Sequence, residues 1–139
     1  MFSDKNKKVL APLFALFGPM PLFVVERYLP HPAFAEEIFK LLITVMLLKA
    51  GKRNLVFISI MCGVFFTLSE SIFYLANILI VKNPELFLER IVFTGILHTS
   101  TFAYIYLMGR KGRNWLISGF IMNIIIHFLY NYWVLHYFH

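Results

Sequence analysis

Residues 55–81 read LVFISIMCGVFFTLSESIFYLANILIV, and Glu70 is the only Asp, Glu, Lys or Arg among them. About 20 apolar residues span the hydrocarbon core of a bilayer, so this stretch is long enough to cross a membrane with some tilt. A carboxylate at the centre of such a helix costs about 2.5–3.5 kcal/mol on insertion scales. The stretch therefore predicts a transmembrane helix whose glutamate is retained for function.

The composition extends this prediction to the whole chain. Of the 139 residues, 60% are hydrophobic and only 14% are charged. A soluble domain of this size cannot bury so much apolar surface. We expect an all-α, polytopic membrane protein that forms a single transmembrane helical domain over residues 1–139. Cys62 is the only cysteine, so no disulfide can form within the chain.

Four further apolar runs flank the first one. Together they predict a compact bundle of about five transmembrane helices, with spans at about 9–25, 34–48, 55–81, 87–108 and 115–138. The first run contains Pro12, Gly18, Pro19 and Pro21, which should kink it or leave it partly non-helical. A cleaved signal peptide is the alternative for this run, because lysines precede it. Its prolines favour a membrane span.

The net charge of +6 is divided among three small clusters beside apolar runs, namely Lys5/Lys7/Lys8, Lys49/Lys52/Arg53 and Arg110/Lys111/Arg113. Five spans put all three clusters on one side of the membrane, which the positive-inside rule identifies as the cytoplasm. We therefore expect a multi-pass protein of the cell membrane, with its amino terminus inside and its carboxyl terminus outside. The clusters do not form one basic patch, so we expect no nucleic-acid partner.

Ionisable residues recur inside four of the five runs: Glu36, Glu37, Glu70, His98 and His127. With a rise of about 1.5 Å per residue, they lie roughly 16–24 Å from the cytoplasmic end of their spans. Four separate helices thus place their polar groups in one slab in the outer half of the membrane. Such groups face the interior of a bundle rather than lipid, so we expect a shared, hydrated site.

Helical spacing and residue type suggest the chemistry of this site. Asn123, His127 and Asn131 recur every four residues and form one stripe, and Lys40 can reach either Glu36 or Glu37. Glutamates, histidines and an asparagine supply a base for water, an electrophile or metal site, and donors for an oxyanion. This combination is typical of hydrolysis.

The same residues resemble a known family. The segment Glu36-Glu37-Ile38-Phe39-Lys40 resembles the EExxK motif of the PrsW family of intramembrane proteases, which is related to the CAAX prenyl proteases and bacteriocin-immunity proteins. The second motif of that family is similar to Gly63-x2-Phe66-x3-Glu70-x3-Tyr74. Its last two motifs are similar to Arg90 with His98 and to His127-x3-Asn131. Ser71 and Phe102 depart from the family pattern, and the chain is shorter than typical members.

The resemblance implies that the protein is a peptidase that cuts a membrane-anchored protein substrate near the outer half of the bilayer. It implies that Glu36 and Glu37 activate water, that His98 holds or polarises the water, and that His127 and Asn131 steady the oxyanion. In a metalloprotease version, Glu70, His98 and His127 bind Zn²⁺ and leave a fourth position for water. In a metal-free glutamic protease version, Glu36 is the base. Both versions remain open at this stage.

Two other classes of function use the same residues. Buried Glu and His chains also build proton- or ion-coupled transporters, but these need polar groups along the whole path. Here the residues cluster at one depth, and the cytoplasmic halves of the second and third spans are almost entirely apolar. A non-catalytic binding or immunity protein that retains the same fold is the other alternative. The simplest alternative is that the glutamates have a structural role only, in which they form ion pairs with Lys40 or Arg90 and stabilise the bundle.

Overall fold

The computed structural model describes residues 3–26, 28–29, 31–51, 55–81 and 84–137, and these residues form helices and short connections without any strand. The described residues contain six helices: α1 (Asp4–Phe17), α2 (Pro19–Glu26), α3 (Pro32–Leu48), α4 (Val56–Val81), α5 (Pro84–Lys111) and α6 (Arg113–Tyr137). The predicted all-α fold is therefore confirmed. The five predicted ranges correspond to α1 with α2, and then to α3, α4, α5 and α6.

The proline-rich first run is broken, as its sequence predicts. Helices α1 and α2 meet at Gly18 with a bend of 43°. Pro19 opens α2, where a missing N–H and a fixed φ are tolerated. Ser3 caps the other end of α1, because its hydroxyl accepts a hydrogen bond from the backbone N–H of Asn6 at 3.3 Å.

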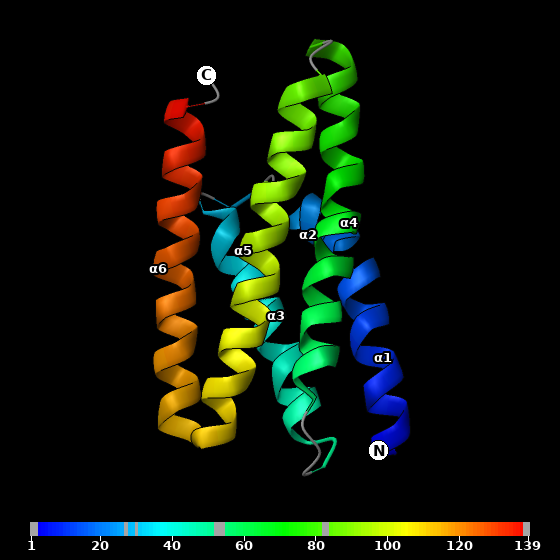
Figure 1. Ribbon diagram of the computed structural model, residues 1–139, viewed down its shortest axis with the longest axis vertical. Helices are drawn as coiled ribbons and strands as arrows, with labels where there is room; N and C mark the ends of the chain where they lie inside the picture. The colour runs from blue at the N-terminus through cyan, green and yellow to red at the C-terminus, as the bar shows by residue number, and fades with distance from the viewer. Residues whose placement is uncertain (1–2, 27, 30, 52–54, 82–83, 138–139) are drawn as a thin grey trace.

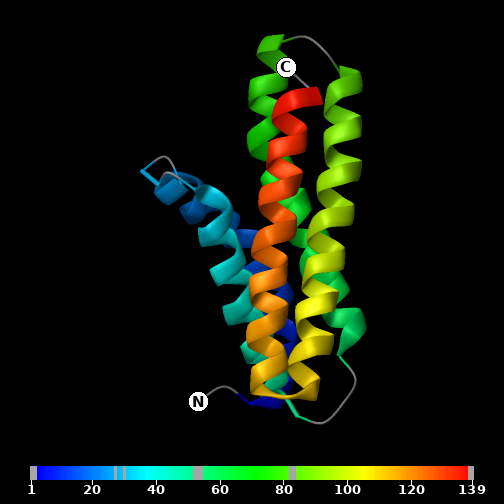
Figure 2. The same cartoon turned by 90° about the vertical axis from the view of Figure 1, so that its left-hand side faces the viewer.

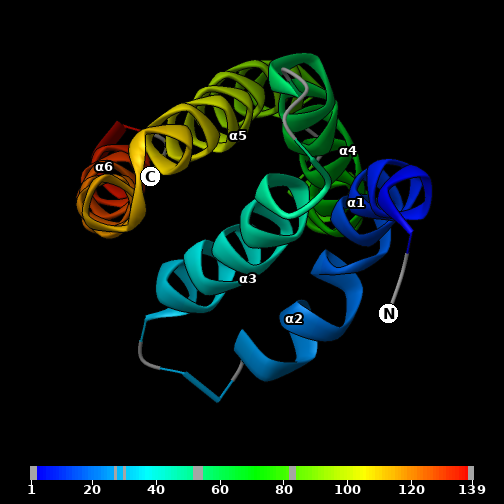
Figure 3. The same ribbon diagram turned by 90° about the horizontal axis from the view of Figure 1, so that it is seen from below.

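The long helices α4, α5 and α6 lie side by side in Figures 1 and 2. Seen from below, α6, α5, α4 and α1 form a curved row, and α3 lies on the concave side of that row (Figure 3). Helix α3 contacts α1, α5 and α6, whereas α2 contacts α1, α3 and α4. This arrangement makes α3 the central helix, so its side chains can meet those of four others.

Close packing in one half of the bundle is apolar. Ala11, Leu47, Cys62, Phe66 and Phe102 are all buried there, on α1, α3, α4 and α5. Where α4 begins, the backbone N–H of Leu55 donates to the hydroxyl of Tyr106 at 3.0 Å. This apolar core is thus continuous across four helices.

Three helices are long and apolar enough to cross a membrane, with the qualifying segments at Val56–Phe73, Phe87–Lys111 and Arg113–Val134. The bent pair of α1 and α2 makes a fourth if it is counted as one span. Helix α3 has 17 residues and carries Glu36, Glu37 and Lys40, so it does not qualify by length and composition. The fold is compatible with a helical membrane protein, and the division into five spans stays a prediction.

The beginning of α1, the end of α3 and the junction of α5 with α6 lie at one end of the molecule (Figures 1 and 2). The end of α6 lies at the opposite end. Lys7 ties two of the basic segments together, because its ammonium donates to the side chain of Asp4 and to the carbonyl of Lys49, each at 2.9 Å. Lys52 and Arg53 lie outside the described residues.

Candidate functional site

The predicted ionisable residues converge. Glu36 and Glu37 extend from α3, Glu70 from α4, His98 from α5 and His127 from α6. Glu37, His98 and His127 are at most 3% exposed, and Glu36 is 8% exposed. Each of these side chains lies within 4 Å of another one in the set, so the five residues form one cluster. That this cluster is a hydrated functional site stays a prediction.

One half of the site is built around Glu37. The ammonium of Lys40 donates to Oε1 of Glu37 at 2.6 Å, and Nδ1 of His127 lies 2.8 Å from the same oxygen. Lys40 also donates to the hydroxyl of Thr101 at 3.3 Å. Glu37 therefore has a fixed cationic partner and also fixes the orientation of the His127 ring.

The other half is built around Glu36. Nε2 of His98 lies 3.9 Å and Nε2 of His127 lies 3.8 Å from Oε2 of Glu36. Nε2 of His98 also lies 2.5 Å from Oε2 of Glu70. His127 joins the two halves, because its two ring nitrogens face different glutamates. The neighbouring residues Glu36 and Glu37 thus have different surroundings and different chemical uses.

Phe66 and Asn123, which the sequence placed in a motif and in a polar stripe without assigning their contacts, help to hold this arrangement. Phe66 packs edge-on against the His98 ring at a centroid distance of 4.8 Å, and the Lys40 ammonium lies 5.5 Å from the centre of the Phe66 ring. Asn123 donates from Nδ2 to the carbonyl of Thr101 at 3.0 Å. Phe66 lies one turn before Glu70 and Asn123 one turn before His127, so helical spacing is the signal that identifies them.

Some buried polar atoms at the site have no hydrogen-bond partner within the described residues. They are Oε2 of Glu37, Nδ1 of His98 and Oδ1 of Asn123. An unsatisfied buried polar atom costs about 1–3 kcal/mol. Groups of this kind concentrate at functional sites or bind water.

Asn131 and Arg90 belong to the family-like motifs but lie away from the glutamates along their helices. Asn131 lies one helical turn beyond His127 on α6 and is partly buried. Arg90 lies eight residues before His98 on α5. The hydroxyls of Thr94 on α5 and Tyr130 on α6 lie 2.9 Å apart, and this hydrogen bond joins the two helices. The side chain of Tyr74, which ends the second motif, lies outside the described residues.

The histidines at the ends of the predicted spans have other neighbours. His31 packs edge-on against Phe128, with ring centroids 5.2 Å apart. Nδ1 of His136 lies 2.9 Å from the carbonyl of Tyr132, in its own helix. His139 lies outside the described residues. The printed contacts of His31 and His136 thus lie outside the cluster of glutamates and histidines.

Three residues of the site lie close enough together to hold a metal ion, and they differ from the expected ligand set by one residue. One ligand atom each from Glu36, Glu70 and His98 lie within 4.8 Å of one another. The metal version of the family resemblance implied Glu70, His98 and His127. Among the described residues, the compact group contains Glu36 in place of His127, whose Nδ1 atom lies 2.8 Å from Glu37.

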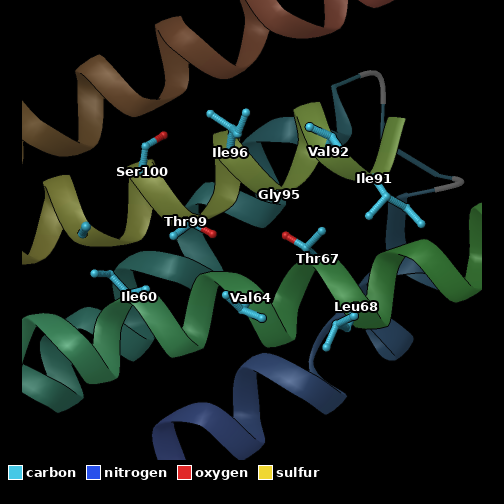
Figure 4. Close-up of a pocket in the computed structure, with 11 residues that line it drawn as sticks. Ile60, Val64, Thr67, Leu68, Ile91, Val92, Gly95, Ile96, Thr99 and Ser100 are labelled. Carbon is cyan, nitrogen blue, oxygen red and sulfur yellow. The ribbon is translucent and has the colours of Figure 1, made fainter. Parts of the chain in front are cut away.

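An apolar groove of about 690 Å³ lies on a different face of α4 and α5 (Figure 4). Thr67, Gly95 and Thr99 lie along it, and its described lining residues include no ionisable side chain. Thr99 follows His98 directly, so the groove and the polar cluster lie on different faces of the same helix. The groove is therefore separate from the candidate site.

No family model, no curated protein and no solved structure matches this chain. The resemblance to the PrsW family therefore rests on the four short motifs themselves.

Proposed function

We propose that this protein is an intramembrane protease that hydrolyses a peptide bond of a membrane-anchored protein. One observation carries the proposal: four helices bring Glu36, Glu70, His98 and His127 together inside the bundle. Each buried ionisable group opposes membrane insertion, so a chain that retains them together gains something by their proximity. Hydrolysis needs the groups that meet here, namely a proton acceptor, a polarising group and hydrogen-bond donors.

The reaction begins with a water molecule between Glu36 and His98. Its oxygen attacks the carbonyl carbon of the scissile bond while its proton passes to Oε2 of Glu36 or to Nε2 of His127. The carbonyl oxygen becomes an oxyanion, which His127 and Asn131 stabilise as donors, as the family resemblance implies. The C–N bond then breaks, and the leaving amine takes up the proton that the base had accepted.

Glu37 acts indirectly in this mechanism. Its contacts with Lys40 and with Nδ1 of His127 leave Nε2 of His127 directed at Glu36. A carboxylate that orients a histidine in this way also stabilises the imidazolium form if the ring accepts a proton. Glu36 and His127 are therefore the candidate proton acceptors, and Glu37 is a positioning residue.

The substrate follows from the depth and orientation of the site. With the amino terminus in the cytoplasm, the cluster lies in the outer half of the bilayer. A soluble protein does not reach that depth, whereas the membrane segment of an anchored protein does. We therefore propose cleavage near the outer membrane boundary of a membrane-anchored substrate.

Conduction of ions is the less favoured alternative. A conduction path needs polar groups from one face to the other, but Leu47, Cys62 and Phe102 fill the bundle between the cluster and the end with the basic segments. Their fully buried side chains favour a site that is open from one side only.

The proposal is tested with purified protein in proteoliposomes that also contain single-span reporter proteins. Wild-type protein should cut a reporter, whereas Glu36→Gln and His98→Ala should reduce cutting at least about 100-fold, as expected when a base or a polarising group is lost. The matched controls Glu85→Gln and His136→Ala alter exposed residues and should cut normally. Unchanged cutting by the Glu36 and His98 variants would exclude this mechanism.

A further inference from the structure

We infer that Glu36, Glu70 and His98 bind a divalent transition-metal ion, and that His127 stands beside this ion rather than binding it. The inference rests on the proposed function and deepens it, since it identifies the polarising group of the same site. It concerns a binding equilibrium that can be measured without any substrate. With Glu36 bound to the ion, His127 is the proton acceptor of the two candidates named above.

The geometry requires only small movements of side chains. Tetrahedral Zn²⁺ with bonds of about 2.0–2.1 Å places its ligand atoms about 3.3 Å apart. Nε2 of His98 lies 2.5 Å from Glu70 and 3.9 Å from Glu36, so these separations lie on either side of that value. The ligand atoms of all three residues lie within 4.8 Å of one another. Rotations of the two glutamate side chains, each with three χ angles, therefore need to change no separation by more than about 1.5 Å.

The donor atoms select the class of metal. An imidazole nitrogen with two carboxylate oxygens suits zinc and its first-row neighbours, whereas Mg²⁺ and Ca²⁺ prefer oxygen ligands alone. Three protein ligands leave a fourth position for water, which is the arrangement of catalytic rather than structural zinc. The charge also matches, because two carboxylates offset the two positive charges of the ion.

Neighbouring residues keep these ligands in place. Phe66 packs against the ring of His98 and restricts its rotation. Lys40 lies 2.6 Å from Glu37, so the closest cation in the network is directed at the glutamate that is not a proposed ligand. The positive charge of Lys40 is thus balanced by Glu37 and not by one of the three proposed metal ligands.

His127 is assigned a different role from the one that its sequence suggested. Its Nδ1 atom is held by Glu37, while Nε2 lies 3.8 Å from Oε2 of Glu36. That position adjoins the proposed ion and is suited to accept a proton from a water molecule bound there. His127 would therefore affect cleavage but not ion binding.

The test begins with wild-type protein that has been stripped by a chelator and purified in detergent, to which Zn²⁺ alone is added. We expect one ion per chain by equilibrium dialysis with elemental analysis. Glu70→Gln and His98→Ala should weaken binding at least about 100-fold, since a ligand is lost. His127→Ala should bind within about threefold of wild type and yet cut no reporter. Glu85→Gln is the matched control for a lost carboxylate elsewhere, and it should bind normally.

One measurement on the wild type guards against misfolded variants. Replacement by Co²⁺ should give the visible absorption of a nitrogen- and oxygen-ligated ion.

The outcomes separate this inference from the proposed protease activity. Stripped wild type that binds no Zn²⁺ overturns the metal site, and equal loss of binding in His127→Ala overturns the ligand set. Cleavage that continues without metal leaves the protease in place and removes the ion from it. Zn²⁺ binding without cleavage of any reporter supports the metal site and contradicts the proposed protease activity.

Discussion

Lys40 is fully buried, and its ammonium contacts Glu37, Thr101 and the face of Phe66. Removing one partner of a buried ion pair leaves the other charge uncompensated, which costs about 3–5 kcal/mol. We therefore expect Lys40→Met to lower the free energy of unfolding by about that amount. Chemical denaturation in detergent, followed by helical circular dichroism, measures the change.

The double variant Lys40→Met with Glu37→Gln supplies the control, because it removes both charges. It should recover part of the lost stability, whereas Lys5→Met, at an exposed position of α1, should change little. Equal stability of Lys40→Met and wild type would show that Glu37 has found another partner.

At the scale of single residues, the sequence identified which ionisable groups meet. It did not predict which of them contact one another, or that Glu36 and Glu37 have different partners. Glu36 and Glu37 stand out because a carboxylate in an apolar run is expensive wherever it points. Their different roles depend on a rotation of about 100° between neighbouring helical positions, and on which helix packs against each face. The contact of Thr101 with Lys40 joins residues 61 positions apart, so no local pattern contains it.

Helices α4 and α5 make the most extensive contact in the fold, and Gly63 permits their close approach. A Cβ atom at Gly63 would lie 2.5 Å from the Cα atom of Thr99, which is backbone and cannot rotate away. We expect Gly63→Ala to force the two helices apart, with a loss of about 1–3 kcal/mol typical of overpacking. The same displacement should separate Glu70 from His98 and reduce both Zn²⁺ binding and cleavage.

Gly95 offers a matched control on the facing helix. A Cβ atom there would lie 3.5 Å from the Cγ2 atom of Thr67, which is an ordinary contact. Gly95→Ala should therefore retain the stability and the binding of wild type. Thermal unfolding of both variants in the same detergent makes the comparison, and an equal loss in both would refute the role assigned to Gly63.

The elements themselves follow largely from local chemistry. Prolines predicted the break between α1 and α2, and apolar runs predicted the other helices. The boundaries of the helices were predicted less accurately. Helix α5 begins at Pro84 and continues to Lys111, beyond the predicted range 87–108 at both ends. Gly112 alone separates α5 from α6, because its φ of 136° reverses the chain in one residue. A hydropathy profile does not predict a turn of one residue.

The whole molecule combines one polar cluster with two chemically different ends. The described basic segments at the beginning of α1, the end of α3 and the junction of α5 with α6 share one end, and the other end carries the carboxyl terminus of α6. This arrangement agrees with an odd number of crossings, although the short α3 does not qualify as a span by itself. Packing against α1, α5 and α6 provides the burial that its hydropathy does not predict.

Orientation in the membrane gives the last prediction. We expect the variant Lys5→Cys to have its thiol in the cytoplasm and His136→Cys to have its thiol outside, as the positive-inside rule requires for five spans. Both positions are exposed, whereas the native Cys62 is fully buried and should not react. In intact cells, a membrane-impermeant maleimide should label only His136→Cys, and after lysis it should label both variants. Wild-type protein measures the background from Cys62. Labelling of both variants from outside would indicate an even number of crossings, and labelling of Lys5→Cys alone would invert the protein and move the site to the cytoplasmic half of the bilayer.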